Sequence, residues 1–163
     1  MNDLLGKRYQ PEVEDCFQAA RKYFANLGIE IRDYAFPQDF WEYEDNMYGR
    51  LFDKEGFYVV DTDRWKPRPH DVLLIPGSTR VSFPTHVGIL TEEGKVFHHY
   101  TDRVSELSDF KGIWRTPTMV LRHPDVPVID KEQVRKDVPI TELLPEHVKR
   151  RLKIENLVHD TGS

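Results

Sequence analysis

Cysteine, long apolar runs and an excess of basic charge are all scarce in this sequence of 163 residues. A single cysteine excludes an internal disulfide and any metal cluster held by cysteines alone. The apolar runs are only a few residues long, so we expect no membrane-spanning segment. Lys and Arg number 23 against 28 Asp and Glu, a net charge of −5, which lacks the basic field that nucleic-acid binding relies on. The first ten residues, MNDLLGKRYQ, lack the apolar core of a secretory signal.

Composition predicts a folded core and a division of the chain. Apolar residues make up 39% of the chain and aromatic residues 12%, which argues against a disordered protein. The length suits one domain with an appendage. Residues 124–163 contain no aromatic residue but carry four of the 11 prolines. We therefore predict a core domain at residues 1–123 and a C-terminal extension at residues 124–163.

The clearest predicted helix begins at Asp15. Counting from Cys16, small or apolar side chains recur at helical spacing and form one face: Ala19, Ala20, Tyr23, Phe24 and Leu27. Asp15 suits the N-cap, with Gln18 three residues later, and Gly28 suits the C-terminal cap. Cys16 is thus predicted to lie in the first helical turn, on the face that packs against the rest of the protein.

Short strands are expected after residue 56. Five runs are apolar or alternating and are bounded by Pro, Gly or charged residues: 57–60, 72–75, 87–90, 96–100 and 118–121. Before them, the aromatic stretch 36–52 predicts one or two short helices packed by Phe40, Met47, Tyr48 and Leu51. The predicted fold class is α+β, with N-terminal helices packed on a mainly antiparallel sheet.

Two histidines are predicted to meet on one hairpin. A three-residue loop at residues 92–94 closes the hairpin in a register that sets Gly88 opposite His98. His86 then lies diagonal to His98 on the same face, whereas His99 points to the opposite face. The β-carbons of a diagonal pair are about 7–8 Å apart, a separation that two imidazole rings bridge.

Cys16, His86 and His98 together supply a nucleophile, a general base and a group that orients the base. A helix start stabilises a thiolate, whereas nearby carboxylates raise the thiol pKa, and three are close in sequence: Glu12, Glu14 and Asp15. Other interpretations stay open. The cysteine is an inert packing residue, the histidines are sheet residues without a chemical role, or the three residues hold a metal ion. Metal sites usually show a shorter ligand spacing than this one.

One family shares the clearest motifs of the chain. NlpC-like cell-wall cysteine peptidases, papain-like hydrolases of peptidoglycan stem peptides, show motifs that resemble Asp15-Cys16 at a helix start and the runs 85–89 (THVGI) and 96–98 (VFH). Residues 69–73 (PHDVL) resemble the family's Pro-Gly-Asp-Leu strand entry, with His70 in place of glycine. Phage tail assembly proteins of the lambda tail-protein-K kind share further runs that resemble residues 98–100 (HHY), 103–105 (RVS), 112–115 (GIWR) and 120–123 (VLRH). The resemblance covers about residues 5–123.

The resemblance implies a papain-like, NlpC-type fold and a cysteine peptidase of the phage tail tip that needs no metal and no cofactor. It implies Cys16 as the nucleophile, His86 as the general base and His98 as the third polar residue. Tyr9 matches the family's upstream tyrosine, which faces the substrate near the oxyanion, and it is equally compatible with a packing role. Such an enzyme, made in the host cytoplasm without a signal peptide, would travel in the virion tail tip and act on the periplasmic cell wall.

The extension at residues 124–163 is expected to dock on other tail-tip proteins. Pro145 starts a predicted short helix that sets Val148 and Leu152 four residues apart, beside the basic cluster 149–151. A solvated tail and a strap across its own domain are the alternatives. For the whole protein, two rivals to the hydrolase stay open: a structural tail-tip or assembly protein that retains the fold, and an intracellular amidase or acyltransferase.

Overall fold

The computed structural model describes residues 1–35 and 46–127. The chain divides into two compact units, Met1–Val126 and Pro127–Ser163, and all the described helices and strands belong to the first. Two predictions therefore lie outside the described residues. They are the C-terminal arm from residue 128 onward, with its helix at Pro145, and the packing role of Phe40.

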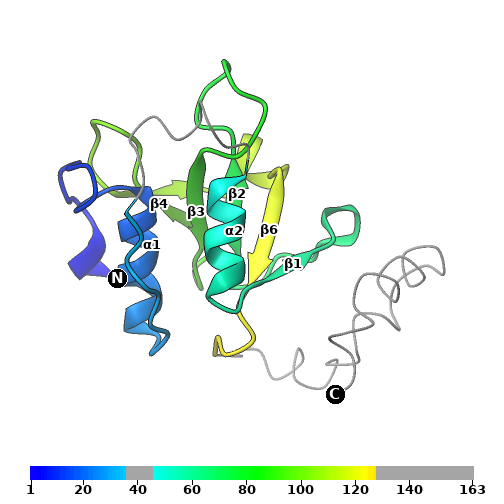
Figure 1. Cartoon of the computed structure of the whole chain (residues 1–163). Coiled ribbons are helices and arrows are strands. Elements are labelled where there is room, and N and C mark those ends of the chain that lie inside the picture. The colour runs from blue at the N-terminus through cyan, green and yellow to red at the C-terminus, as the bar shows by residue number, and fades with distance from the viewer. Residues whose placement is uncertain (36–45, 128–163) are drawn as a thin grey trace. The chain divides into compact units, whose positions relative to one another are not determined.

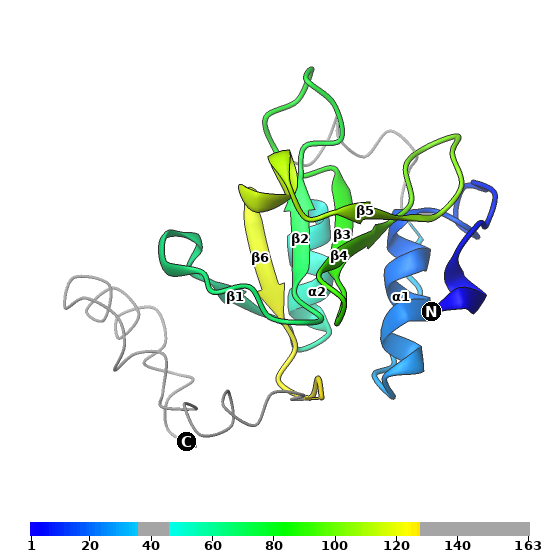
Figure 2. The ribbon, with the colours of Figure 1, turned by 180° about the vertical axis from the view of Figure 1, so that it is seen from behind.

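In the described ranges, a six-stranded antiparallel sheet is combined with two α-helices (Figures 1 and 2). The helices are α1 (Cys16–Asn26) and α2 (Met47–Lys54), with short 3₁₀ turns at η1 (Asn2–Leu4), η3 (Thr62–Arg64) and η4 (Gly112–Arg115). The strands are β1 (Tyr58–Val60), β2 (Val72–Ile75), β3 (His86–Leu90), β4 (Lys95–His98), β5 (Glu106–Asp109) and β6 (Met119–Arg122), in the order β1-β6-β2-β3-β4-β5. The α+β prediction is confirmed. None of the described helices is long and apolar enough to cross a membrane.

Both helices pack on the same face of the sheet, as the two opposite views show. Strand side chains alternate between the two faces. Those facing the helices include Val72, Leu74, Val87, Ile89 and Phe97. Those on the other face pack with Trp114 and include Leu73, Ile75, Leu90, Val96 and Val120. β2 is buried on both faces, which explains its unbroken apolar sequence VLLI.

Local capping determines where α1 begins and ends. The Asp15 carboxylate accepts a hydrogen bond from the Gln18 N–H at 2.8 Å, so Asp15 is the N-cap. At the other end Gly28 has a φ of 82°, and the N–H of Ile29 donates to the Phe24 carbonyl at 2.9 Å, which is a Schellman cap. The predicted helix is confirmed, and Cys16 is its first residue.

The predicted hairpin register is also confirmed. Gly88 pairs with His98, and the N–H of Thr91 donates to the Lys95 carbonyl at 2.8 Å. Gly94 takes the left-handed conformation with a φ of 78°. The predicted strand at 96–100 needs a correction at both ends, because β4 spans Lys95–His98.

One strand escaped prediction altogether. β5 lies at the edge of the sheet and has the sequence ELSD, whose side chains alternate between half-buried and exposed positions. Edge strands of this kind lack the apolar pattern by which strands are recognised. The strand matters because it pairs with β4 and brings Glu106 opposite His98.

The N-terminal segment is held against a loop nearly a hundred residues later. Ser105 Oγ donates to the Leu4 carbonyl at 2.6 Å and accepts from the Lys7 N–H at 2.9 Å. Just beyond, Arg8 forms an isolated antiparallel bridge with Val104. These bonds explain the serine of the RVS run, since the Ser105 side chain forms hydrogen bonds with backbone groups of the distant N-terminal segment.

A buried ion pair connects β6 to the start of β2. The Arg122 guanidinium donates to both carboxylate oxygens of Asp71, at 2.7 and 3.0 Å, and both side chains are buried. Trp65 Nε1 donates to the same carboxylate at 2.9 Å. Next to this pair, His70 has a φ of 74°, a conformation that favours glycine. That backbone explains why a glycine suits this position in the resembling family.

Candidate active site

Cys16, His86 and Tyr9 line one cavity of about 630 Å³. Its described walls come from the N-terminal segment, the first residues of α1, α2 and β3, and the loops that follow β2 and β4. His98 is fully buried and is absent from the described lining, so it contacts His86 on the side away from the cavity. The three predicted catalytic residues are thus gathered in one region, with two of them facing the cavity.

The Cys16 thiol is buried and neutral at ordinary pH. Its S–H donates to the Tyr48 hydroxyl, with 3.3 Å between Sγ and Oη. Burial is the main effect on the thiol pKa and, together with the negative Asp15, raises it to about 11. The Tyr48 hydroxyl and the backbone amides of Val87 and Phe17 act in the opposite direction, because they donate to the thiolate. Hydrogen-bond donors that would stabilise a thiolate therefore surround the sulfur, but the thiol stays protonated at rest.

The two histidines form a relay that ends on β5. His86 Nε2 lies 3.3 Å from His98 Nδ1, and His98 Nε2 lies 2.6 Å from Ser108 Oγ. A Glu106 carboxylate oxygen 3.6 Å from His98 Nε2 favours a proton on that nitrogen, which then donates to Ser108. His98 Nδ1 accordingly accepts from His86 Nε2–H, and these hydrogen bonds assign the lone pair of His86 to Nδ1. A lone pair at Nδ1 is what a general base requires.

Aromatic rings enclose this relay. Tyr100 stacks on His86 with ring centroids 4.2 Å apart, and Trp114 lies 5.8 Å from His86 and 5.0 Å from His98. A β-carbon at Gly88 would lie 2.4 Å from the Trp114 ring. Glycine is therefore required there so that the indole can cover both imidazoles.

Burial keeps both imidazoles neutral. It lowers the pKa of His86 well below the usual value, and the neighbouring His98 and His99 add to the effect. Burial also lowers the pKa of His98 to about 4, with Arg103 and His99 as further causes. The resting site thus combines a neutral thiol with a neutral imidazole relay.

The thiol and the base share the cavity without a direct hydrogen bond between them. Among the residues that the structure describes, the Cys16 thiol bonds to Tyr48, and the His86 ring bonds to His98. Transfer of the thiol proton to His86 therefore requires the S–H bond to turn away from Tyr48.

Tyr9 is half-buried at the cavity wall. Its neighbours in sequence form two backbone bridges, Arg8 to Val104 and Gln10 to Glu14, which fix the segment on both sides. Its ring meets His99 edge to face at 5.8 Å, and burial raises the pKa of the Tyr9 hydroxyl. This position suits a group that faces a bound substrate.

Sequence reasoning missed two polar groups of the site. Tyr48 was predicted only as a packing aromatic, and no local motif signals its contact with Cys16. Ser108 lies on the unpredicted strand β5, diagonal to His98 in the β4–β5 register. The diagonal rule that placed His86 beside His98 would have found it, had the strand been recognised.

A metal site was one alternative for the cysteine and the histidines. Within residues 1–35 and 46–127, no group of three or more His, Cys, Asp or Glu side chains is arranged to hold a metal ion.

Comparison with known proteins gives one informative similarity. No family model matches the chain, and no solved structure matches it. The chain is 30% identical over 121 residues to tail tip assembly protein K of Escherichia phage lambda, an alignment that covers 74% of this chain. The chain spans 59% of the length of that protein.

Proposed function

We propose that this protein is a tail-tip component of a phage or phage-like particle and a cysteine peptidase of peptidoglycan stem peptides. One observation carries the enzymatic part. Cys16 at a helix start and His86, the first member of the His86–His98–Ser108 relay, border the same cavity. The papain-like, NlpC-type assignment of the fold belongs to this proposal.

The chemistry is acyl transfer to sulfur. His86 Nδ1 takes the proton of the Cys16 thiol, and the sulfur attacks the carbonyl carbon of the scissile amide. The backbone N–H of Cys16 at the helix start and the Tyr9 hydroxyl stabilise the oxyanion. His86 then gives the proton to the leaving amine, and water, deprotonated by His86, hydrolyses the thioester. The reaction consumes one water and regenerates the thiol.

The cavity suits an anionic peptide. Arg80 and Arg103 line it, and neither guanidinium has a hydrogen bond or an ion pair in the described part of the chain. Asp15 is the only acidic residue among the described lining residues, and its two oxygens already accept the N–H groups of Gln18 and Glu12. Two guanidiniums at the cavity wall, in a protein of net charge −5, favour a ligand with carboxylates, such as a stem peptide.

The tail-tip part of the proposal is supported by the similarity to tail tip assembly protein K. We propose other tail-tip proteins as partners, contacted through residues 124–163. In this proposal the protein is carried in the virion and acts on the periplasmic wall of the host. Mass spectrometry of purified virions tests this, because the peptides of this chain must be found there.

Digestion of purified peptidoglycan tests the enzymatic part. Wild-type protein is expected to release new stem-peptide fragments, identified by mass spectrometry, and Cys16→Ala is expected to release none. The matched control is Ser82→Ala, which removes an exposed oxygen outside the described cavity lining. Equal cleavage by wild type and Cys16→Ala would exclude Cys16 as the nucleophile.

A structural tail-tip protein is the second candidate, and a specific observation favours it. The thiol has a pKa of about 11 and bonds to Tyr48 instead of His86. A purely structural role predicts that phage particles carrying Cys16→Ala assemble and infect as well as the wild type. The hydrolase predicts normal assembly with delayed or lost entry into the host.

A further inference from the structure

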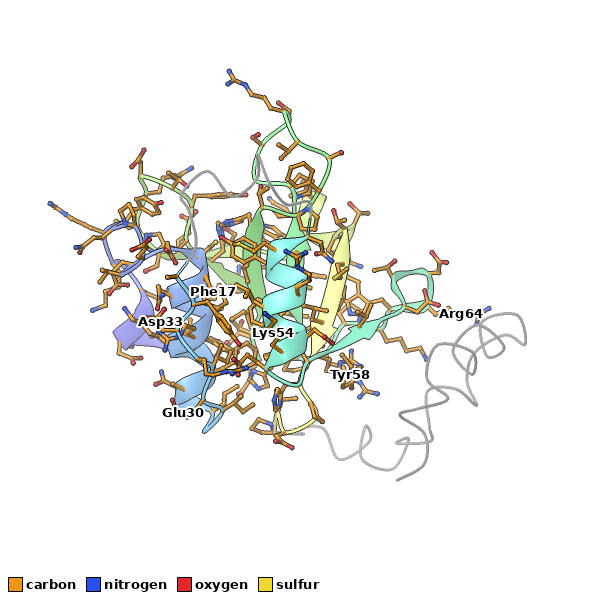
Figure 3. All side chains as sticks on the ribbon, viewed as in Figure 1. Phe17, Glu30, Asp33, Lys54, Tyr58 and Arg64 are labelled. Carbon is orange, nitrogen blue, oxygen red and sulfur yellow. The ribbon has the colours of Figure 1, made fainter. Side chains whose placement is uncertain are left out.

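The Cys16 thiol and the Tyr48 hydroxyl form a buried polar contact between the two helices. Sγ and Oη are 3.3 Å apart, Cys16 is the first residue of α1, and Tyr48 is the second residue of α2. Next to the cysteine, Phe17 lies between the two helices (Figure 3). Its ring stacks on the Tyr48 ring with centroids 6.1 Å apart. The ring is thereby fixed with its hydroxyl at the sulfur.

A hydroxyl can serve both forms of the thiol. Facing a neutral S–H, the Tyr48 oxygen accepts, as the structure shows. Facing a thiolate, which has no proton to donate, the same O–H turns and donates. Burial raises the pKa of Tyr48 well above its usual value, so the phenol keeps its proton throughout.

Other groups also face the sulfur, and its further donors are backbone amides. Asp15, the N-cap of α1, is negative and opposes the thiolate, and the Tyr9 phenol comes from the segment before α1. From β3 the backbone amide of Val87 favours the thiolate, and His86 borders the same cavity. Among the described side chains, Tyr48 alone forms a hydrogen bond with Sγ.

We infer that Tyr48 is a further catalytic residue, whose hydroxyl accepts the thiol hydrogen bond at rest and donates to the sulfur once the proton has left. The inference rests on the proposed function of Cys16 as the nucleophile. In the step concerned, the S–H bond of Cys16 breaks, the proton binds His86 Nδ1, and the electron pair stays on sulfur. The Tyr48 O–H donates to that sulfur until the new carbon–sulfur bond forms. It thus lowers the energy of a thiolate that burial and Asp15 disfavour.

Alkylation of the thiol by iodoacetamide tests the inference, and Cys16 is the only cysteine that can react. Tyr48→Phe retains the stacked ring and removes the donor, so the alkylation rate at pH 8.5 should fall about tenfold, equal to a rise of about one unit in the thiol pKa. The matched control is Tyr23→Phe, which removes another buried tyrosine hydroxyl, one that bonds to His70 instead of the thiol. Its rate should equal that of the wild type.

A second substitution keeps the test decisive if Tyr48→Phe folds poorly. Tyr48→3-fluorotyrosine preserves the shape and makes the phenol a stronger donor, so alkylation should become faster. Unchanged rates in both Tyr48 variants would overturn the inference. The assay contains no peptidoglycan and is therefore independent of the hydrolase. If the Tyr48 variants change the alkylation rate but the protein cleaves no peptidoglycan, Tyr48 is a donor to the thiolate without a catalytic role, and the inference is overturned.

Discussion

At the scale of single residues, burial keeps the thiol and the imidazole rings of the site uncharged at rest. The Cys16 pKa is raised to about 11 and the His98 pKa is lowered to about 4, in both cases mainly by burial. An ion pair of thiolate and imidazolium is therefore not the resting state. In the proposed reaction, the charges form only as the proton moves from Cys16 to His86 and the sulfur attacks the scissile amide.

Ser108 provides the first test at this scale. The Ser108→Ala variant removes the acceptor of the His98 Nε2–H bond, so the tautomer that leaves His86 Nδ1 free is less favoured. One neutral hydrogen bond predicts a decrease of roughly three- to tenfold in the rate of peptidoglycan cleavage. Steady-state kinetics on purified peptidoglycan measures it.

The control for Ser108 is conservative rescue. Ser108→Thr keeps the hydroxyl and should restore most of the rate. It should also restore the stability that Ser108→Ala loses by leaving the Nε2–H of the buried His98 without this acceptor. Equal rates in wild type and Ser108→Ala would show that His86 acts without this relay.

Sequence patterns predicted some polar groups of the site, Cys16, His86 and His98, but not Tyr48, and the difference has a physical reason. The position of Cys16 at a helix start and the pairing of His86 with His98 follow from the periodicity of α1 and of the β3–β4 hairpin. The roles of these three residues come from the family resemblance. Tyr48 meets Cys16 across two helices, 32 residues apart in sequence. No local period encodes that contact, because tertiary packing alone determines it.

At the scale of elements, α1 both stabilises the fold and sets the chemistry of its first residue. Its macrodipole and its first amides favour a thiolate at Cys16, whereas its N-cap Asp15 carries a negative charge that disfavours one. Structural capping and thiol activation therefore oppose each other at this helix start.

The Asp15→Asn variant separates these two effects. Asparagine is a good N-cap, so α1 should persist with a loss of stability of about 1 kcal/mol, because the side-chain nitrogen cannot accept the hydrogen bond from the Glu12 N–H. Removal of the charge should lower the thiol pKa and speed alkylation at pH 8.5 several-fold.

The matched control is Glu14→Gln, since Glu14 bonds to Lys22 and is not a cause of the Cys16 pKa shift. Alkylation by Asp15→Asn that is no faster than by this control would mean that the Asp15 charge does not reach the sulfur.

Elements were predictable where one face is continuously apolar. α1 and the β3–β4 hairpin were predicted with their caps and register, because burial makes a one-residue slip costly. β5 was not predicted, because three of its four residues are polar, its apolar Leu107 is exposed, and its pairing is determined by β4. The relay's last member, Ser108, was lost with that strand.

At the scale of the whole molecule, burial of the site couples stability to pH. The pKa values of His86 and His98 are lowered by burial, so between pH 6.5 and about 4 the unfolded chain binds more protons than the folded one. The contribution of these two histidines to the free energy of unfolding is therefore fully present above pH 6.5 and decreases as the pH falls through this window.

Urea unfolding at pH 7 and pH 5 measures this decrease. We expect a loss of roughly 1–2 kcal/mol for each of these histidines at pH 5. His98→Gln, which cannot be protonated in this range, should show a smaller difference between the two pH values. An equal difference in wild type and variant would mean that His98 is not held neutral by the fold.

The closure of the N-terminal segment on Ser105 has a consequence for synthesis. Cys16 leaves the ribosome 89 residues ahead of Ser105, which at a bacterial-type elongation rate of about 5–20 residues per second is an interval of roughly 5–20 s. For most of that interval β3 and β4 are not yet available to cover the sulfur, because β3 begins only at His86. The nascent thiol has a pKa near the ordinary value of about 8.5, so it reacts with oxidants far more readily than in the folded protein. The chain is thus most exposed to oxidation of its single thiol while it is still being translated.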